Sequence, residues 1–313
     1  MNLLGNLDCE ATWASVALPE PVRRRISLYA TLFAAMAPEG VAHQLWAPAA
    51  VDPARLIAQP GWTPPIVRTD RAPAAFDLAW ADPAARAAND RSANLAIAEA
   101  LGVALPGSGV VGSLAELDAR VAALASQPWI VKARWTAAGR DRARGAGDVA
   151  GELRTRIGRM LERLGPLVLE PWLDRIADLG VCGEIAADGS VTVAGPHGLR
   201  SDPRGGFLGI ELEPALAPEL TATLTATAHA AATQLAAATG YRGRFAIDAF
   251  VYRDGAAHRL HPLCELNARH TFGWVARALG DRLGIRRLGF DPPPPGATVL
   301  IAPGDDHVTA WCA

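Results

Sequence analysis

The stretch from Phe245 to Trp274 reads FAIDAFVYRDGAAHRLHPLCELNARHTFGW and decides the fold of this chain. Its first part alternates and is rich in residues that favour β-strands, a DG turn pair follows, and the chain then extends again. This pattern predicts a β-hairpin with a bulged or longer loop. Asp248 lies on the first strand, and Glu265 and Asn267, two residues apart, share one face at the end of the second.

These three side chains suit a hard metal ion. A carboxylate on each of two paired strands, joined by a carboxamide oxygen, gives an all-oxygen set of the kind that Mg²⁺ prefers. Arg269 follows Asn267 by two residues, so its guanidinium can reach a phosphate shared with that metal. A surface hairpin with scattered charges is the alternative, but it explains less well why Asp248 lies among apolar neighbours.

An Asp on one strand and Glu-x-Asn-x-Arg closing the next resemble the C-terminal signature of the ATP-grasp superfamily. Tyr241-Arg242-Gly243, ahead of the first strand, resembles its biotin carboxylase branch. The resemblance implies that one or two Mg²⁺ ions, or Mn²⁺, bind the metal set and bridge the β- and γ-phosphates of ATP. It also implies that a catalytic arginine steadies the reacting phosphoryl group. These roles fall on Asp248, Glu265 and Asn267 for the metal and on Arg269 for catalysis.

Composition narrows the class of protein. The chain has 313 residues, 50% hydrophobic and 20% charged, which is enough for about two domains with a substantial core. The net charge of −2 argues against a broad nucleic-acid surface. No run approaches the roughly 20 apolar residues of a membrane span, and the N-terminus does not resemble a signal peptide. The four cysteines form no CxxC pair, so we expect a reduced, cytoplasmic setting.

Residues 1–88 predict a small α/β domain without a GxGxxG dinucleotide motif, with a helix at 22–36 and a strand at 41–46. From residue 89, NDRSANLAIAEALGVALP predicts a capped helix and resembles the opening segment of the ATP-grasp domain. The family has Lys at the position of Arg91, where it contacts the nucleotide phosphates. Arg keeps that charge but differs in shape. An exposed arginine in a first helical turn is the alternative.

Residues 128–134, PWIVKAR, predict a strand that ends in charge. Lys132 is the only lysine in a chain that otherwise uses Arg, which favours a need for a compact point charge. The segment resembles the family's Val-Lys-Pro strand. The resemblance implies that Lys132 contacts ATP phosphates, both for binding and for catalysis, while backbone N–H groups of the next loop close over them. That loop has one glycine, Gly139, where relatives often have several.

Residues 167–173, LVLEPWL, resemble the family's adenine hinge. The resemblance implies that Glu170 accepts a hydrogen bond from the exocyclic amine of adenine. It also implies that the adenine edge is read by the backbone of Pro171, Trp172 and Leu173. Asp178 matches the acid near the ribose or the metal. Many ligases have Asp-x-Arg here, whereas this chain has Asp-x-Gly, so the helper arginine is missing or comes from elsewhere.

Between the hinge and the hairpin we expect an irregular polar loop that binds the second substrate. Its donors are His197, Arg200 and Arg204. Arg200 is the preferred anchor for a substrate carboxylate, because a guanidinium can bind a carboxylate through two hydrogen bonds. A solvated loop without a ligand is the alternative.

The motifs follow the family's order over about residues 89–285. They imply an α/β (α+β) ATP-grasp fold, with ATP between two mainly antiparallel sheets. The expected division is an N-terminal α/β domain at 1–88 and an ATP-grasp domain at 89–313. Within the latter we expect a nucleotide lobe at about 89–175 and a metal and substrate lobe at about 176–313.

The implied activity is that of a carboxylate–amine or carboxylate–thiol ligase. It activates a small carboxylic acid, with amino acids among the candidates, as an acylphosphate that an amine attacks, giving ADP and phosphate. Its partners would be small molecules, with a homodimer as an option and neither nucleic acid nor membrane. A kinase of the same fold is one alternative. A non-catalytic nucleotide-binding module is the other, and the full set of metal ligands argues against it.

Overall fold

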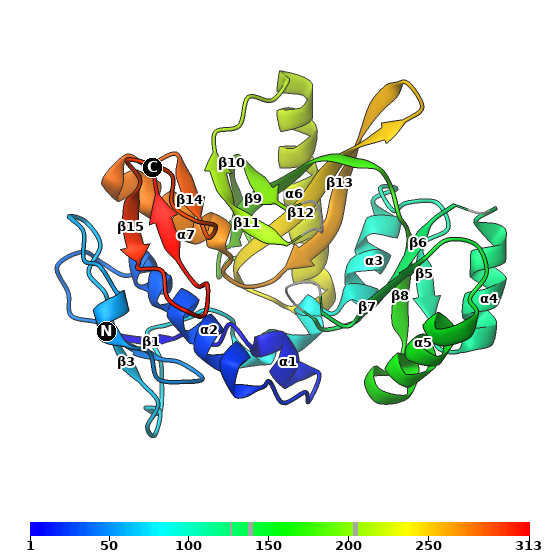
Figure 1. Cartoon of the computed structure of the whole chain (residues 1–313). Coiled ribbons are helices and arrows are strands. Elements are labelled where there is room, and N and C mark those ends of the chain that lie inside the picture. The colour runs from blue at the N-terminus through cyan, green and yellow to red at the C-terminus, as the bar shows by residue number, and fades with distance from the viewer. Residues whose placement is uncertain (126, 137–139, 203–205) are drawn as a thin grey trace.

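The structure is a computed structural model that describes residues 1–125, 127–136, 140–202 and 206–313. The described residues form three sheets, of four, eight and four strands. In Figure 1 the N-terminal elements and the last strands of the large sheet lie together at one end of the molecule, the rest of the large sheet lies in the middle, and the second four-stranded sheet lies at the other end. The predicted α/β architecture with two antiparallel sheets and a preceding N-terminal sheet is confirmed.

The N-terminal sheet is parallel, with strand order β3-β2-β1-β4. The helix predicted at 22–36 is an α-helix that tightens into a 3₁₀-helix, and the strand predicted at 41–46 is shorter than expected. A third 3₁₀-helix leads into the rest of the chain. The elements are β1 (Asn2–Leu4), α1 (Cys9–Trp13), α2 (Glu20–Ala30), η1 (Thr31–Met36), β2 (Gln44–Trp46), η2 (Pro53–Arg55), β3 (Ile66–Arg68), β4 (Leu78–Ala79) and η3 (Pro83–Asn89).

The small lobe is an antiparallel sheet with order β5-β8-β6-β7. Alternate residues of β6 and β8 pack in one core with the two helices that follow β5 and β7. Because a strand alternates its side chains, Lys132 and Glu170 point to the opposite face from that core. The elements are β5 (Gly109–Val111), α4 (Leu114–Ala123), β6 (Trp129–Ala133), β7 (Arg142–Gly145), α5 (Gly151–Leu164) and β8 (Leu167–Pro171).

The large sheet is antiparallel throughout, with order β13-β12-β9-β10-β11-β14-β16-β15. Phe245, Ile247 and Ala249 of β12 pack in one core with helix α6, so Asp248 faces the other side of the sheet. The elements are β9 (Arg175–Ile185), β10 (Val191–Ser201), β11 (Phe207–Leu212), α6 (Pro218–Thr239), β12 (Gly243–Asp254), β13 (Ala257–Asn267), α7 (Phe272–Leu283), β14 (Arg287–Gly289), β15 (Thr298–Ile301) and β16 (Ala310–Cys312).

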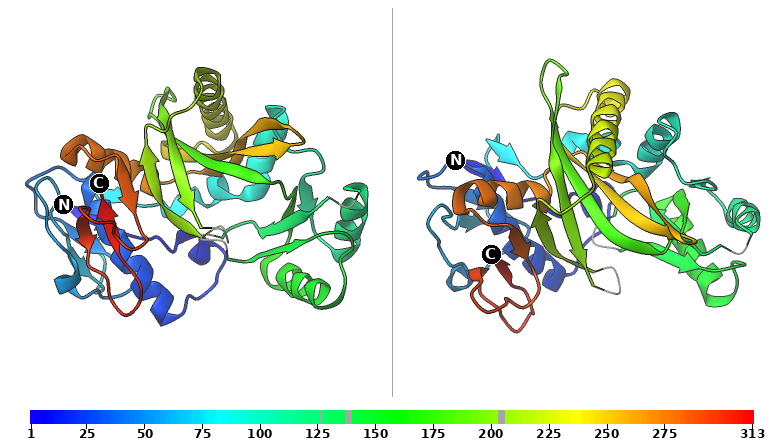
Figure 2. Two further views of the ribbon diagram at one scale, coloured as in Figure 1. Left: turned by 45° about the horizontal axis from the view of Figure 1, so that its top comes forward. Right: turned by 90° about the horizontal axis from the view of Figure 1, so that it is seen from above.

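Packing joins parts of the chain that are distant in sequence. Helix α3 (Arg91–Ala100) opens the predicted nucleotide lobe, yet Ile97 and Ala98 share the core of α6 and the hairpin. The C-terminal strands share one core with the N-terminal domain, as Leu3 and Leu300 illustrate. Figure 2 shows both ends of the chain at the same end of the molecule. The predicted boundary at residue 88 therefore separates sequence segments that pack extensively together, and it stays a prediction.

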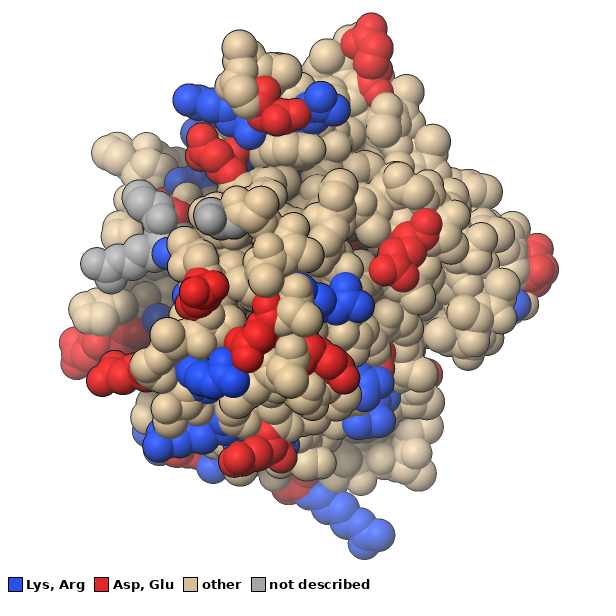
Figure 3. Space-filling view, turned by 90° about the vertical axis from the view of Figure 1, so that its right-hand side faces the viewer, with Lys and Arg blue, Asp and Glu red and all other residues tan. Residues whose placement is uncertain are grey.

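Two surface properties bear on partners. None of the helices in the described residues is long and apolar enough to cross a membrane. On the face of the molecule that Figure 3 shows, Lys and Arg side chains are interspersed with Asp and Glu. That face therefore lacks the continuous basic patch that a nucleic-acid surface needs.

Candidate active site

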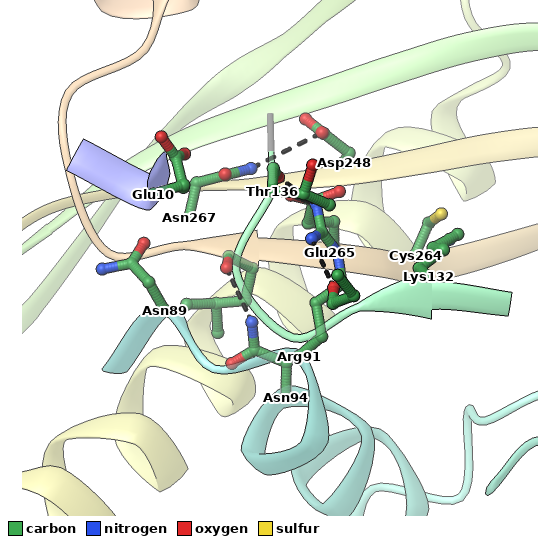
Figure 4. Close-up of polar contacts among 12 residues, drawn as sticks. Glu10, Asn89, Arg91, Asn94, Lys132, Thr136, Asp248, Cys264, Glu265 and Asn267 are labelled. Atoms are coloured by element: carbon green, nitrogen blue, oxygen red, sulfur yellow. Dashed lines mark hydrogen bonds and ion pairs between the residues drawn. The ribbon is translucent and has the colours of Figure 1, made fainter. Parts of the chain in front are cut away.

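The predicted hairpin is confirmed and brings the expected metal ligands together, but a two-residue turn between Asp254 and Ala257 replaces the bulged or longer loop that was expected. Asp248 lies directly opposite Glu265 in the β12–β13 pairing. The register shifts immediately beyond this pair, so a β-bulge adjoins the two carboxylates. The Nδ2 of Asn267 donates to Oδ2 of Asp248 at 3.5 Å, and Figure 4 shows the three side chains on one side of the sheet.

Electrostatics favour a cation at this point. Burial raises the pKa of Asp248 to about 7, and the neighbouring Glu265 adds to the rise. Burial also acts to raise the pKa of Glu265, but the charges of Arg91 and Lys132 outweigh it and hold that pKa below its ordinary value. In the described residues no group of three or more His, Cys, Asp or Glu side chains could hold a metal. Two carboxylates and one amide fit Mg²⁺, which commonly binds one or two carboxylates and substrate phosphates.

Arg91 is a buried link between the two lobes rather than an exposed helix residue. It opens helix α3, whose N-cap Asp90 accepts a hydrogen bond from the N–H of Ser92. Its Nη2 donates to Oε1 of Glu265 at 2.7 Å, and its Nη1 donates to the carbonyl of Ala133 on β6 at 3.0 Å. Its side chain is only 12% exposed. The guanidinium thus joins the metal hairpin to the strand that carries Lys132.

Two asparagines that the sequence analysis did not single out hold the end of β13 against α3. Asn89 exchanges two hydrogen bonds with the backbone of Ala268, at 2.9 and 3.2 Å. Asn94 donates to the carbonyl of Leu266 at 2.8 Å. Asparagine is unfavourable inside a helix because its amide competes for backbone groups. Asn94 within α3 was therefore a signal that tertiary contacts use that side chain.

Lys132 and Glu170 form an ion pair between β6 and β8. Their Nζ–Oε2 distance is 2.5 Å, and both side chains are largely buried. Burial acts to lower the pKa of Lys132, but Glu170 and Cys264 together outweigh burial and raise that pKa. Lys132 is the only lysine in the sequence. The motifs predicted Lys132 at phosphate and Glu170 at adenine, and none of them indicated that the two side chains bind each other.

The hinge backbone has fewer donors than the motif implied. Pro171 has no N–H group, and the N–H of Trp172 donates to the carbonyl of Pro128 at 2.7 Å. Among the three predicted hinge residues, Leu173 therefore remains as the N–H donor toward an adenine edge. Beside the hinge lies a cavity that combines polar groups with an apolar wall. It is lined by Arg91, Glu170, His261, Cys264 and Glu265 together with Leu95, Leu105 and Leu263.

An arginine that the sequence analysis missed accompanies Asp178. The Nη1 of Arg175 donates to Asp178 at 3.2 Å, and its guanidinium lies 3.9 Å from the ring centroid of Phe250. Positions 175 and 178 of a regular strand face opposite sides. The β9–β12 pairing shifts its register between Ala177 and Arg175, so the two side chains can lie on the same side of the sheet. Arg175 thus places a guanidinium beside Asp178.

His197 and Arg200 lie on strand β10, and the expectation of an irregular loop around them is wrong. His197 is 2% exposed, and its ring fills the space over Gly180 in the row His197–Gly180–Asp248–Glu265 across four strands. Burial, assisted by the charge of Arg277, lowers its pKa to about 3. A side chain at Gly180 would overlap that ring, which explains the glycine in Asp-x-Gly.

Arg200 lies three positions after His197 and therefore on the opposite face of β10. There it pairs with Asp291 at 2.8 Å. The structure thus separates the two predicted substrate residues, and their substrate role stays a prediction. Gly139 and Arg204 lie outside the described residues.

The predicted catalytic Arg269 is paired with a residue of the N-terminal domain. Its Nη2 lies 2.5 Å from Oε1 of Glu10, on α1, and both side chains are buried. No motif in the sequence pointed to Glu10. Its single signal was an acidic residue in the short helix that follows β1.

The structure was compared with known proteins. No protein-family model matches the chain, and no curated protein sequence matches it. Pyruvate carboxylase T882A of Rhizobium etli, with acetyl coenzyme-A, matches 91% of this chain and 27% of its own, with 15% identity and a TM-score of 0.59. The biotin carboxylase domain dimer of Hydrogenobacter thermophilus 2-oxoglutarate carboxylase, with MgADP, ADP and bicarbonate, matches 72% of this chain and 61% of its own, with 17% identity and a TM-score of 0.54.

A third solved structure, the ADP complex of purK, N5-carboxyaminoimidazole ribonucleotide synthetase, matches at 17% identity and a TM-score of 0.49, covering 66% of this chain and 53% of its own. The chain spans less than two thirds of the length of each of these three structures. At such identities the likeness is one of fold. The predicted ATP-grasp fold is confirmed.

Proposed function

We propose, from its ATP-grasp fold, that this chain is an ATP- and Mg²⁺-dependent ligase that joins a small carboxylic acid to an amine. The observation that carries the proposal is the meeting of four elements at one point. Glu265 of the hairpin and Arg91 of the helix line one cavity. Lys132 of the small lobe pairs with Glu170 of its wall, and Asp178 of β9 is joined to its Cys264 through Arg175. Phosphoryl transfer needs such convergent charge more than it needs a covalent catalyst.

The proposed binding roles follow the geometry. Asp248, Glu265 and Asn267 hold Mg²⁺, which neutralises charge on the β- and γ-phosphates when bound. Arg91 and Lys132 bind phosphate oxygens, and each exchanges its present carboxylate partner for them. The adenine edge meets Glu170 and the N–H of Leu173, and Asp178 with Arg175 lies beside the ribose or the metal.

The proposed reaction has two steps. A carboxylate oxygen of the acid attacks the γ-phosphorus, the bond from that phosphorus to the β,γ-bridging oxygen breaks, and ADP leaves. The amine nitrogen then attacks the acyl carbon, the carbon–oxygen bond to phosphate breaks, and the amine proton passes to solvent. Arg269 donates hydrogen bonds to the phosphoryl oxygens as charge moves onto them. Amino acids and dipeptides are the first acids to test, because they carry a carboxylate and an amine of the required size.

The setting and assembly are further parts of the proposal. All four cysteines are free, which suits a reduced cytoplasmic compartment. A homodimer is the assembly that we propose to test first, because a neighbour of the same fold was solved as a domain dimer.

The decisive experiment is a screen of amino acids and dipeptides that measures ADP and inorganic phosphate together, with mass detection of products. We expect phosphate to appear in step with ADP, and hydroxylamine to trap the activated acid as a hydroxamate. Glu265→Gln is the control, since it removes one metal ligand. We expect this variant to keep its fold and to lose turnover. ADP without free phosphate, together with a phosphate ester, would replace the ligase with the kinase. Binding of Mg·ATP without any turnover would favour the binding module.

A further inference from the structure

Glu10 is the one carboxylate that the described part of the N-terminal domain places on a predicted catalytic residue. It is 6% exposed, and Cys9 Sγ donates to its Oε2 at 3.1 Å while its Oε1 pairs with Arg269. Taking two such charged groups from water is costly unless each has a partner. The pair therefore fixes the relative position of helix α1 and the segment that follows β13.

Helix α1 is held firmly enough to position another residue. The side chain of Asn6, just before α1, exchanges hydrogen bonds with the backbone of Ala81 at 2.9 and 3.1 Å. At the end of α1, the indole N–H of Trp13 donates to the carbonyl of Pro83 at 3.2 Å. Both ends of the helix are thus tied to the segment after β4, so Glu10 starts from a fixed backbone.

The backbone on both sides of Arg269 is held too. Asn89 holds Ala268, and the N–H of His270 donates to the carbonyl of Trp80 at 2.8 Å. The side chain of Arg269 is then left to be oriented by its own contacts. Its Nη1 donates to the carbonyl of His270 at 3.2 Å, and in the described part of the chain its buried Nε has no hydrogen-bond partner.

Two other carboxylates lie on the side of the sheet from which Arg269 emerges. Arg269 follows Glu265 by four residues and Asn267 by two, so it leaves the strand on the face that carries Glu265 and its opposite partner Asp248. Without Glu10, Arg269 would be drawn toward these two metal ligands, because a buried cation needs an anionic partner. In that position it would compete with Mg²⁺. With Glu10 present, the guanidinium stays off the metal ligands, and its free Nε–H can donate to a phosphoryl oxygen.

We propose that Glu10 is a positioning residue that keeps Arg269 away from the metal carboxylates and directed at the transferred phosphoryl group. The N-terminal domain thereby completes the active site. This inference rests on the proposed function, because it requires Mg²⁺ at Asp248 and Glu265.

The test is calorimetric titration of Mg²⁺ at fixed ADP with wild type, Glu10→Ala, Glu10→Gln and the double variant Glu10→Ala/Arg269→Ala. We expect Glu10→Ala to weaken apparent Mg²⁺ affinity on the order of tenfold, as loss of residues that orient metal ligands does. The double variant should recover most of this affinity, since the competing cation is gone. Glu10→Gln keeps the shape of the side chain and should give an intermediate loss, which provides the test if Glu10→Ala does not fold.

Asp306→Ala is the matched control. Asp306 pairs with Arg55 at 3.1 Å, so it also joins the C-terminal part to the N-terminal domain, but it contacts none of the site residues. We expect this variant to lower the melting temperature and leave Mg²⁺ affinity unchanged. If Glu10→Ala behaves in the same way, Glu10 is only a domain contact and the proposal is wrong. If wild type binds no Mg·ADP at all, the proposed function fails and takes this inference with it.

Discussion

Replacing Asp248 with Asn should make the ligand-free protein more stable and strongly reduce its stabilisation by Mg·ADP. Burial raises the pKa of this carboxyl from 3.8 to about 7 in the folded protein. When the pKa of a carboxyl is higher in the folded than in the unfolded protein, the free energy of unfolding is unaffected below the unfolded-state pKa. It then falls as the pH rises through the folded-state pKa. A difference of about three units corresponds to an upper limit of about 4 kcal/mol. Because Asp248 is partly exposed, we expect about half of that.

The assay is denaturant unfolding of wild type and Asp248→Asn between pH 4 and pH 8, without nucleotide. The two stabilities should be similar near pH 4 and diverge by about 2 kcal/mol at pH 8, with the variant more stable. Saturating Mg·ADP at pH 8 should then stabilise wild type far more than the variant, since the bound cation compensates the buried charge. Parallel plots of stability against pH for the two proteins would contradict this prediction. They would mean that burial does not disfavour the ionised form of Asp248.

Two further predictions follow from the same geometry. Lys132 is the only lysine, so its acetylation by an amine-selective reagent can be followed by mass spectrometry separately from that of the N-terminus. Mg·ATP should protect Lys132 from the reagent. Glu170→Gln should speed acetylation, because Glu170 raises the pKa of Lys132. Unprotected, nucleotide-independent labelling would count against Lys132 at phosphate. Gly180→Ala should cost about 1–3 kcal/mol of unfolding free energy because the new methyl group overlaps His197. Gly195→Ala is the control and should be near neutral, because a Cβ there meets open space. Equal costs for the two changes would show that His197 is not tightly packed over Gly180.

Much of the fold could be predicted from the chain because its strongest signals are local. Helix α5 spans Gly151–Leu164, where the apolar residues repeat with helical period between two glycines, which is a local signal. Asp248, Glu265 and Asn267 were grouped correctly because a hairpin with a short turn fixes both the pairing and the face of each side chain. The same alternation placed Lys132 and Glu170 on the face away from the small-lobe core.

The sequence by itself determined which residue types end each strand, and hence the order of the motifs and the metal hairpin. Only the tertiary structure decided which of those residues meet. Arg175 joins Asp178 through a register shift that no periodicity reveals. His197 fills the space over Gly180 because strands β9 and β10 pair at that row, which lies well away from the turn that joins them. Glu10 reaches Arg269 across more than two hundred residues of chain. The two-residue alternation of a strand fixes the face on which a side chain lies, whereas the partner of that side chain depends on how separate elements pack. A single β-bulge changes both the face and the partner.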